Sequence, residues 1–165
     1  MSASVERVLE AAAAVGLDVD VVEFPDGTRT ADDAAAAVGC KVDQIVKSMI
    51  FAAGPDREIV LALTSGANQV DGDELAVLAG VDACHRATVD EVRETTGFAI
   101  GGVAPLGHLN PLRTWIDPHL VTFDTIWAAA GSPRHVFAVD PSKLVELTGA
   151  TVADFTASSD AKPPS

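Results

Sequence analysis

The chain has 165 residues, of which 48% are hydrophobic and 21% charged, and its formal net charge at pH 7 is −13. This length fits one domain with its own core, and no apolar segment approaches the roughly 20 residues that a bilayer span requires. Sequence-independent binding to DNA depends on many Lys and Arg contacts to phosphate, which the acidic composition disfavours. The composition therefore predicts a globular domain that binds neither membranes nor DNA.

The N-terminal residues and the cysteines predict the compartment. Glu6 and Arg7 fall inside an amphipathic pattern, where a secretory signal would carry a continuous apolar stretch. Cys40 and Cys84 form neither a C-x-x-C pair nor a disulfide framework. Both observations favour a cytoplasmic protein.

Apolar spacing and capping residues predict the elements of the first half. Thr30 and Asp33 have the spacing of a helix N-cap, and Asp71 and Glu74 have the spacing of a capping box. Residues 71–74 read D-G-D-E, but Leu75 stands where a calcium loop needs another oxygen ligand, so a cap is favoured over a metal site. In chain order, we expect a helix from residue 4, a strand over 17–24 ending in a turn at 25–27, a helix after residue 30, a hairpin of strands over 47–53 and 58–64, and a helix over 72–79.

The second half continues the alternation of strands and helices. Thr88 and Glu91 repeat the capping-box spacing, and Asp140 before Pro141 is a typical helix start. We expect strands over 81–86, 114–116, 120–123, 125–130 and 135–139, with helices after residue 88 and over 141–147. The pattern predicts a mixed α/β fold in which residues 1–157 form one domain with a largely antiparallel sheet, followed by a disordered tail at residues 158–165.

One loop, F-A-I-G-G-V-A-P-L-G-H, combines glycines with a proline. Gly101 and Gly102 permit positive φ and close approach to a ligand, while Pro105 fixes its own φ and holds Ala104 extended. Such a loop can present the N–H groups of Gly102, Val103 and Ala104 to an oxygen. The alternative is a connection between strands without a chemical role.

Lys47 is the second candidate for chemistry. In an extended strand it shares one face with Met49 and Phe51, so a lysine stands in register with core residues. A lysine at the first position of a strand can instead reach into water. As a cation, Lys47 would hold a phosphate or stabilise developing negative charge.

Several other chemistries are excluded by spacing. His108 occupies the lysine position of a nucleotide-binding loop, and a proline interrupts the phosphate cradle. The four histidines lie far apart without an H-E-x-x-H motif, so we expect no metal and no cofactor. No G-x-S-x-G nucleophile motif occurs.

Three segments in order resemble the YbaK-like aminoacyl-tRNA deacylases, which include free-standing relatives of the editing domain of bacterial prolyl-tRNA synthetases. The segments are G-C-K-V-D-Q-I-V-K-S-M-I-F at 39–51, T-G-F-A-I-G-G-V-A-P-L-G-H at 96–108 and I-W-A-A-A-G-S-P-R at 126–134. The resemblance covers residues 17–152. It implies a barrel-like mixed sheet surrounded by helices. It also implies metal-independent hydrolysis of the ester between tRNA and a wrong amino acid, most often alanine or cysteine on tRNA for proline.

The resemblance also implies residue roles. Lys47 corresponds to the essential lysine of that family, and residues 101–105 correspond to its G-x-x-x-P loop, which holds the aminoacyl carbonyl and the terminal ribose. Ala129 stands where the cysteine-specific branch has serine. The expected partners are the acceptor end of an aminoacyl-tRNA and a synthetase that could recruit the protein. The expected catalytic residues are Lys47, Gly101 and Gly102, and the expected substrate-binding residues are Val103, Ala104, Pro105, Thr30, Gly131 and Ser132.

Two further functions fit the same residues. A non-catalytic module would bind the acceptor end of tRNA or a synthetase and hydrolyse nothing. A Schiff-base enzyme would use Lys47 as a nucleophile, since apolar neighbours lower the pKa of a lysine. Because the chain offers few acid or base side chains near these motifs, a deacylase could also use the 2′-hydroxyl of its own substrate to activate water.

Overall fold

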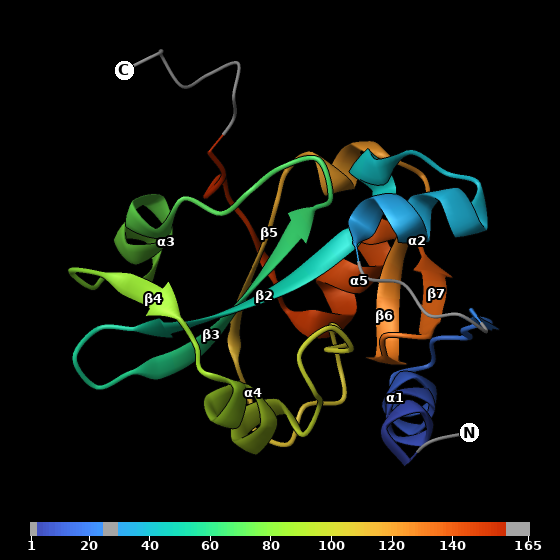
Figure 1. Cartoon of the computed structure of the whole chain (residues 1–165), viewed down its shortest axis with the longest axis horizontal. Coiled ribbons are helices and arrows are strands. Elements are labelled where there is room, and N and C mark those ends of the chain that lie inside the picture. The colour runs from blue at the N-terminus through green and yellow to red at the C-terminus, as the bar shows by residue number, and fades with distance from the viewer. Residues whose placement is uncertain (1–2, 25–29, 158–165) are drawn as a thin grey trace.

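The computed structural model describes residues 3–24 and 30–157, which fold into two β-sheets with helices packed around them (Figure 1). The α-helices of the described residues are α1 (Ala3–Ala14), α2 (Ala31–Val38), α3 (Gly72–Ala79), α4 (Val89–Thr96) and α5 (Pro141–Thr148), with 3₁₀ turns η1 (Val42–Gln44) and η2 (Leu120–Thr122). None of these helices has the length and apolar character to cross a membrane.

The strands form one sheet of three and one of five, each named here in spatial order. The smaller sheet is β1 (Val21–Glu23), β7 (His135–Val139) and β6 (Ile126–Ser132). The larger is β4 (Cys84–Arg86), β2 (Val46–Ala53), β3 (Glu58–Ser65), β5 (Arg113–Ile116) and β8 (Thr151–Val152). Most pairs are antiparallel, while β3 with β5 and β5 with β8 are parallel. The predicted mixed α/β fold is confirmed, but the strands form two sheets rather than one barrel.

An isolated backbone bridge joins the two sheets near the start of β2. An isolated parallel bridge pairs Ile45 with Trp127 of β6, within the described residues. Beyond it, β4 pairs with β2 only from Phe51 to Ala53, so the first half of β2 has its outer edge free of β4. An unpaired strand edge offers backbone groups to whatever lies beside it.

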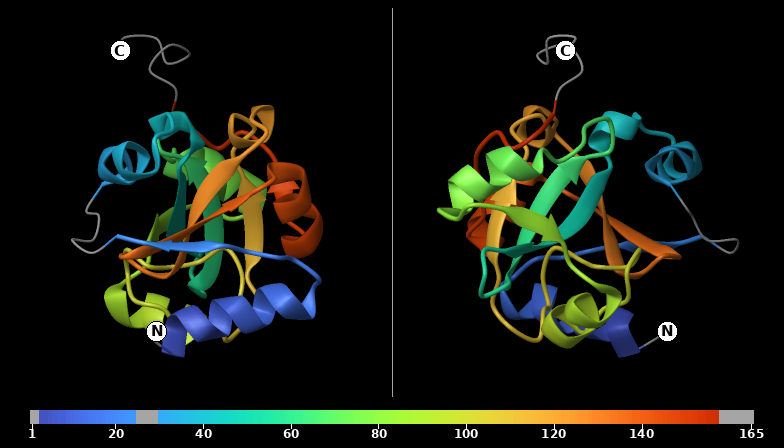
Figure 2. Two further views of the ribbon diagram at one scale, coloured as in Figure 1. Left: turned by 90° about the vertical axis from the view of Figure 1, so that its right-hand side faces the viewer. Right: turned by 60° about the vertical axis from the view of Figure 1, so that its left-hand side comes forward.

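Apolar side chains of both sheets meet in the main core. Phe98, Ile116 and Phe137 are fully buried there, and full burial of such a side chain stabilises the fold by about 1.5–3 kcal/mol. A second cluster, with Phe51, Leu75 and Phe155, lies under α3. Helices α2 and α3 lie near opposite ends of the β2–β3 hairpin (Figure 1), and α1 runs alongside β1 (Figure 2).

Local capping signals are confirmed by the structure. Thr30 accepts a hydrogen bond from the N–H of Asp33, and Asp71 accepts from Asp73 and Glu74. Thr88 and the following Glu91 form the reciprocal capping box. Each of these bonds satisfies backbone donors that the first helical turn leaves unpaired, which is why short helices begin there.

Three strand predictions are wrong in extent or type. Residues 120–123 form the 3₁₀ turn η2, because Leu120 donates to the carbonyl of Asp117 and Val121 to that of Pro118. The predicted strands over 17–24 and 81–86 are regular only as β1 and β4, and the short β8 was not predicted. The turn predicted at residues 25–27 and the tail at residues 158–165 lie outside the described residues.

Candidate active site

A pocket of about 520 Å³ opens beside the free edge of β2. Its walls come from β2, from the loop before β5, from β6, and from the start of α2. Five of the predicted site residues line it together: Thr30, Lys47, Gly101, Val103 and Ser132. Lys47 and the glycine loop, more than fifty positions apart in the sequence, therefore face one hollow.

The other predicted residues are buried and do not line the pocket. Gly102, Ala104, Pro105 and Gly131 have little solvent exposure and lie outside the pocket lining. A Cβ on Gly102 would lie 2.6 Å from the Cα of Ser132, so the absence of a side chain lets the two backbones touch. Gly131 has a φ of 100°, and a Cβ there would lie 2.7 Å from the carbonyl oxygen of Ser4. Gly102 and Gly131 thus allow close packing behind the pocket.

The glycine loop begins as a tight turn. The N–H of Gly102 donates to the carbonyl of Ala99 at 3.0 Å, and Gly101, at the third turn position, has the positive φ of 92° that a type II turn requires. The prediction that Gly102 offers its N–H to a substrate oxygen is therefore wrong. None of the described residues accepts a hydrogen bond from the N–H of Val103, which leaves Val103 as the backbone donor of this loop in the pocket lining.

Two side chains brace this loop from behind. His108 donates from Nε2 to the carbonyl of Ala104 at 2.7 Å, and burial lowers the pKa of His108, which favours its neutral form. Arg7 of α1 donates to the carbonyl oxygens of Gly107 and Thr96 at 2.9 and 3.1 Å. Its guanidinium also lies 4.3 Å from the ring centre of Phe98. The loop is thereby fixed to α1 and α4.

Lys47 lies half-buried on β2 and is oriented by a backbone oxygen. Its ammonium donates to the carbonyl of Asn68 at 2.5 Å. Burial lowers the pKa of Lys47, the nearby charge of Arg86 lowers it further, and Asp117 acts in the opposite direction. The ammonium retains hydrogen atoms for a ligand, since Lys has three donors.

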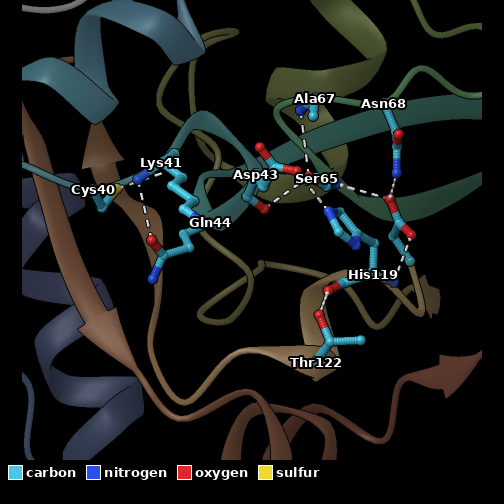
Figure 3. A network of polar contacts seen from close by, with 10 residues as sticks. Cys40, Lys41, Asp43, Gln44, Ser65, Ala67, Asn68, His119 and Thr122 are labelled. Carbon is cyan, nitrogen blue, oxygen red and sulfur yellow. Dashed lines mark hydrogen bonds and ion pairs between the residues drawn. The ribbon is translucent and has the colours of Figure 1, made fainter.

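Asp117 holds the segment that carries Asn68. Asp117 is only 2% exposed, and its carboxylate accepts from the N–H of Ser65 at 3.1 Å, the side-chain amide of Asn68 at 2.9 Å and the N–H of His119 at 2.9 Å. Ser65 donates in turn to the carbonyl of Asp43, whose carboxylate lies 2.7 Å from His119 Nε2 (Figure 3). This network positions the carbonyl that accepts from Lys47. No sequence motif pointed to it.

A second hydrogen-bonded chain lies behind Ser132. Ser132 pairs with His135 across the β6–β7 hairpin, and Glu23 of β1 pairs with His135 on the other side. Ser132 Oγ lies 2.6 Å from His135 Nδ1, and His135 Nε2 lies 3.4 Å from the Glu23 carboxylate. Ser132 Oγ also accepts from the N–H of Arg134 at 3.0 Å, so this hydroxyl is held between the hairpin backbone and the imidazole. Sequence reasoning included Ser132 but missed His135 and Glu23.

Two other pocket residues were also missed. Asp32, in the first turn of α2, and Arg86, at the end of β4, both line the pocket.

The hydroxyl of Ser48 is buried and makes no hydrogen bond to any described residue. Among residues 3–24 and 30–157, no group of three His, Cys, Asp or Glu side chains is placed to hold a metal ion.

Residues 25–147 match the model of the aminoacyl-tRNA editing domain. YwhH of Bacillus subtilis (strain 168), an uncharacterised protein, is 30% identical over 129 residues, which cover 78% of this chain and 81% of YwhH. The proline–tRNA ligase of Nitratidesulfovibrio vulgaris (strain DP4) is 32% identical over 94 residues, 57% of this chain but only 16% of the ligase.

Solved structures agree with this match. A candidate trans-editing enzyme for prolyl tRNA synthetase superposes with a TM-score of 0.89 at 45% identity, covering 96% of this chain and 99% of that one. The hypothetical protein APE2540 superposes with a TM-score of 0.84 at 28% identity, covering 92% and 99%. With a family model matched over most of its length, the chain belongs to the aminoacyl-tRNA editing domain family.

Proposed function

We propose that this protein is a trans-editing deacylase that hydrolyses the ester of mischarged aminoacyl-tRNA without a metal. The observation that carries the proposal is the meeting of Lys47, Gly101, Val103 and Ser132 in one pocket. The favoured substrate is tRNA for proline carrying alanine or cysteine. Similarity to proline–tRNA ligases and to a candidate trans-editing enzyme supports this choice.

The reaction requires few protein groups, because an aminoacyl ester is already activated. Water adds to the carbonyl carbon, the bond to the ribose oxygen breaks, and that oxygen leaves with a proton to give free amino acid and tRNA. In this proposal the N–H of Val103 donates to the oxyanion that forms on the carbonyl. One such donor is worth about 10²–10³ in rate. Lys47 acts as the cation that holds the adjacent phosphate or the developing charge.

Several residues that carry a hydroxyl or carboxylate line the pocket in which we propose that the amino acid binds. Thr30 and Asp32 line the pocket from α2, and Ser132 lines it from β6 with its hydroxyl hydrogen-bonded to His135. We propose Thr30 and Ser132 as the residues that contact the aminoacyl group. Gly101 contacts the terminal ribose, and the buried residues Gly102, Ala104, Pro105 and Gly131 hold these walls in place. A synthetase that recruits the protein in the cytoplasm would supply its substrate.

A deacylation panel tests the proposal. Transfer RNA for proline is charged separately with alanine, cysteine, serine and proline, and release of each amino acid is followed with the native protein and with Lys47→Ala. We expect the native protein to release alanine or cysteine and to spare proline. If the native protein binds the charged tRNA but releases no amino acid, the protein is a binding module and the proposed activity is wrong.

A further inference from the structure

Arg86 lies on the same face of the sheet as Lys47. Arg86 pairs with Phe51 in the β2–β4 ladder, and residues paired in this way point to the same side. Lys47 stands four positions before Phe51, so its side chain also points to that side. The Arg86 guanidinium lies 6.0 Å from the ring centre of Phe51, and both cations line the pocket.

The Arg86 guanidinium has no acidic partner among the described residues. Arg57 is paired with Glu91 and Arg113 with Glu58, each at 2.7 Å, and Arg7 donates to two carbonyl oxygens. The exposed side chains of Arg86 and Arg93 make no hydrogen bond or ion pair within residues 3–24 and 30–157, and of these two only Arg86 lines the pocket. Although the chain has a net charge of −13, this arginine at the pocket has no acidic partner among the described residues, so its guanidinium is available to an anionic ligand.

The positive charges of Lys47 and Arg86 disfavour one another. Burial and the charge of Arg86 both lower the pKa of Lys47. Like charges brought close together repel one another, and an anion placed between them removes that repulsion. Asp32 is the carboxylate that lines the pocket, and it belongs to α2, whereas the cations belong to β2 and β4.

We propose that Lys47 and Arg86 form a clamp for a single phosphodiester, and that its ligand is the last internucleotide phosphate of the tRNA acceptor end. This inference rests on the proposed function and adds Arg86 to its substrate contacts. The geometry suits it, because Val103 and Ser132 line the same pocket as the two cations, so one acceptor end can reach both sets of groups. Arg can bind two phosphate oxygens at once, and Lys adds a point charge.

A double-mutant cycle tests the clamp. Native protein and Arg86→Gln are assayed on a charged acceptor-stem minihelix with either a normal terminal linkage or a neutral methylphosphonate there. We expect Arg86→Gln to lower kcat/KM about 10- to 100-fold on the normal minihelix. On the methylphosphonate minihelix the variant should lose little more, since the contact is already absent. If the variant lowers kcat/KM by the same factor on both minihelices, Arg86 does not contact this phosphate. That result would overturn the clamp.

Controls separate this inference from folding and from the proposed activity. Arg57→Gln removes an exposed arginine in the β2–β3 turn and should leave the cycle unchanged. Arg86→Lys should recover part of the loss, and Arg86→Gln should lower the salt dependence of binding by about one unit of slope. The same cycle is measured on binding of a minihelix that carries no amino acid. Binding of inorganic phosphate is compared between the native protein and Arg86→Gln. A native protein that shows coupled binding but no hydrolysis refutes the deacylase and keeps the clamp. Weaker binding of inorganic phosphate by Arg86→Gln, with unchanged binding of the minihelix, would show a site for free anions and overturn the clamp.

Discussion

Gly102 and Ser132 touch through their backbones, which joins the glycine loop to the β6–β7 hairpin behind the pocket. A methyl group on Gly102 would lie 2.6 Å from the Cα of Ser132, closer than side-chain carbons approach backbone atoms. Two walls of the pocket, from different parts of the sequence, are therefore held at a distance that only glycine allows.

Gly102→Ala should separate these walls. We expect it to lower the free energy of unfolding by about 1–3 kcal/mol and to reduce deacylation, because backbone atoms must shift to admit the methyl group. Urea unfolding and deacylation rates measure both effects. Gly72→Ala, at the start of α3, is the control, since a Cβ there meets Cys84 at 3.3 Å and a smaller shift suffices. Equal stability of the two variants would contradict the close contact.

Lys47→Ala should abolish most deacylation without unfolding the protein. The ammonium is half-buried at the pocket, so its loss removes a charge from the proposed reaction but no part of the main core. We expect a loss of about 10²-fold or more in rate. Circular dichroism checks the fold, and Lys143→Ala on the exposed side of α5 is the matched control. A fully active Lys47→Ala protein would remove Lys47 from the mechanism.

Asp117→Asn should act on both stability and activity. The carboxylate accepts three hydrogen bonds. The NH₂ group of an asparagine in its place would face an N–H group that needs an acceptor. We expect a loss of about 1–3 kcal/mol in the free energy of unfolding. Asn68 would then lose its anchor, which misplaces Lys47 and lowers deacylation more than Asp56→Asn in the exposed β2–β3 turn. Unchanged activity in Asp117→Asn would show that the Asn68 carbonyl keeps its place without Asp117.

Stability should depend on pH through His108. Burial lowers the pKa of His108 from its usual value near 6.5, so below that pH the unfolded chain binds a proton that the folded chain excludes. The free energy of unfolding is thus expected to fall as the pH drops below about 6.5. His108→Gln should weaken this dependence, while His85→Gln, at an exposed position of β4, should retain it. Urea titrations between pH 5 and 7 would detect the difference, and identical slopes in all three proteins would refute the assignment.

The substrate's own 2′-hydroxyl should contribute to hydrolysis. The described pocket lining includes one carboxylate, on Asp32, while His135 stands behind Ser132. Replacing the terminal adenosine with its 2′-deoxy form should therefore slow deacylation strongly, with binding of the minihelix little changed. Full activity on the 2′-deoxy substrate would show that a protein group activates the water. The Ser132–His135 pair would then be the first candidate for that role.

Sequence reasoning succeeded where a signal is local. The caps at Thr30, Asp71 and Thr88 depend on side chains a few positions from the backbone groups they satisfy, and each helix begins where its cap predicts. The stretch at residues 120–123 was misread because a short apolar run fits a buried strand and a 3₁₀ turn equally well.

The parts of the site that sequence reasoning missed depend on pairing across strands. His135 and Glu23 become neighbours only through the register of β7 with β1, and Arg86 joins Lys47 only through the register of β4 with β2. Asp117 reaches Asn68 because β5 lies parallel beside β3. None of these relationships has a fixed spacing along the chain, so no motif could reveal them from one sequence.

The parallel pairing of β3 with β5 has a consequence for how the protein reaches its native state. The two strands are separated by the whole segment from α3 to the glycine loop, so the chain must close a long loop before either strand gains from the contact. Folding rates fall as such distant contacts dominate, which favours milliseconds to seconds over microseconds. During synthesis the β2–β3 hairpin can form early, but the wall contributed by β6 is added only after β7 has been made. The proposed editing activity would thus be acquired at the end of folding, and we expect a chain truncated before β7 to lack it entirely.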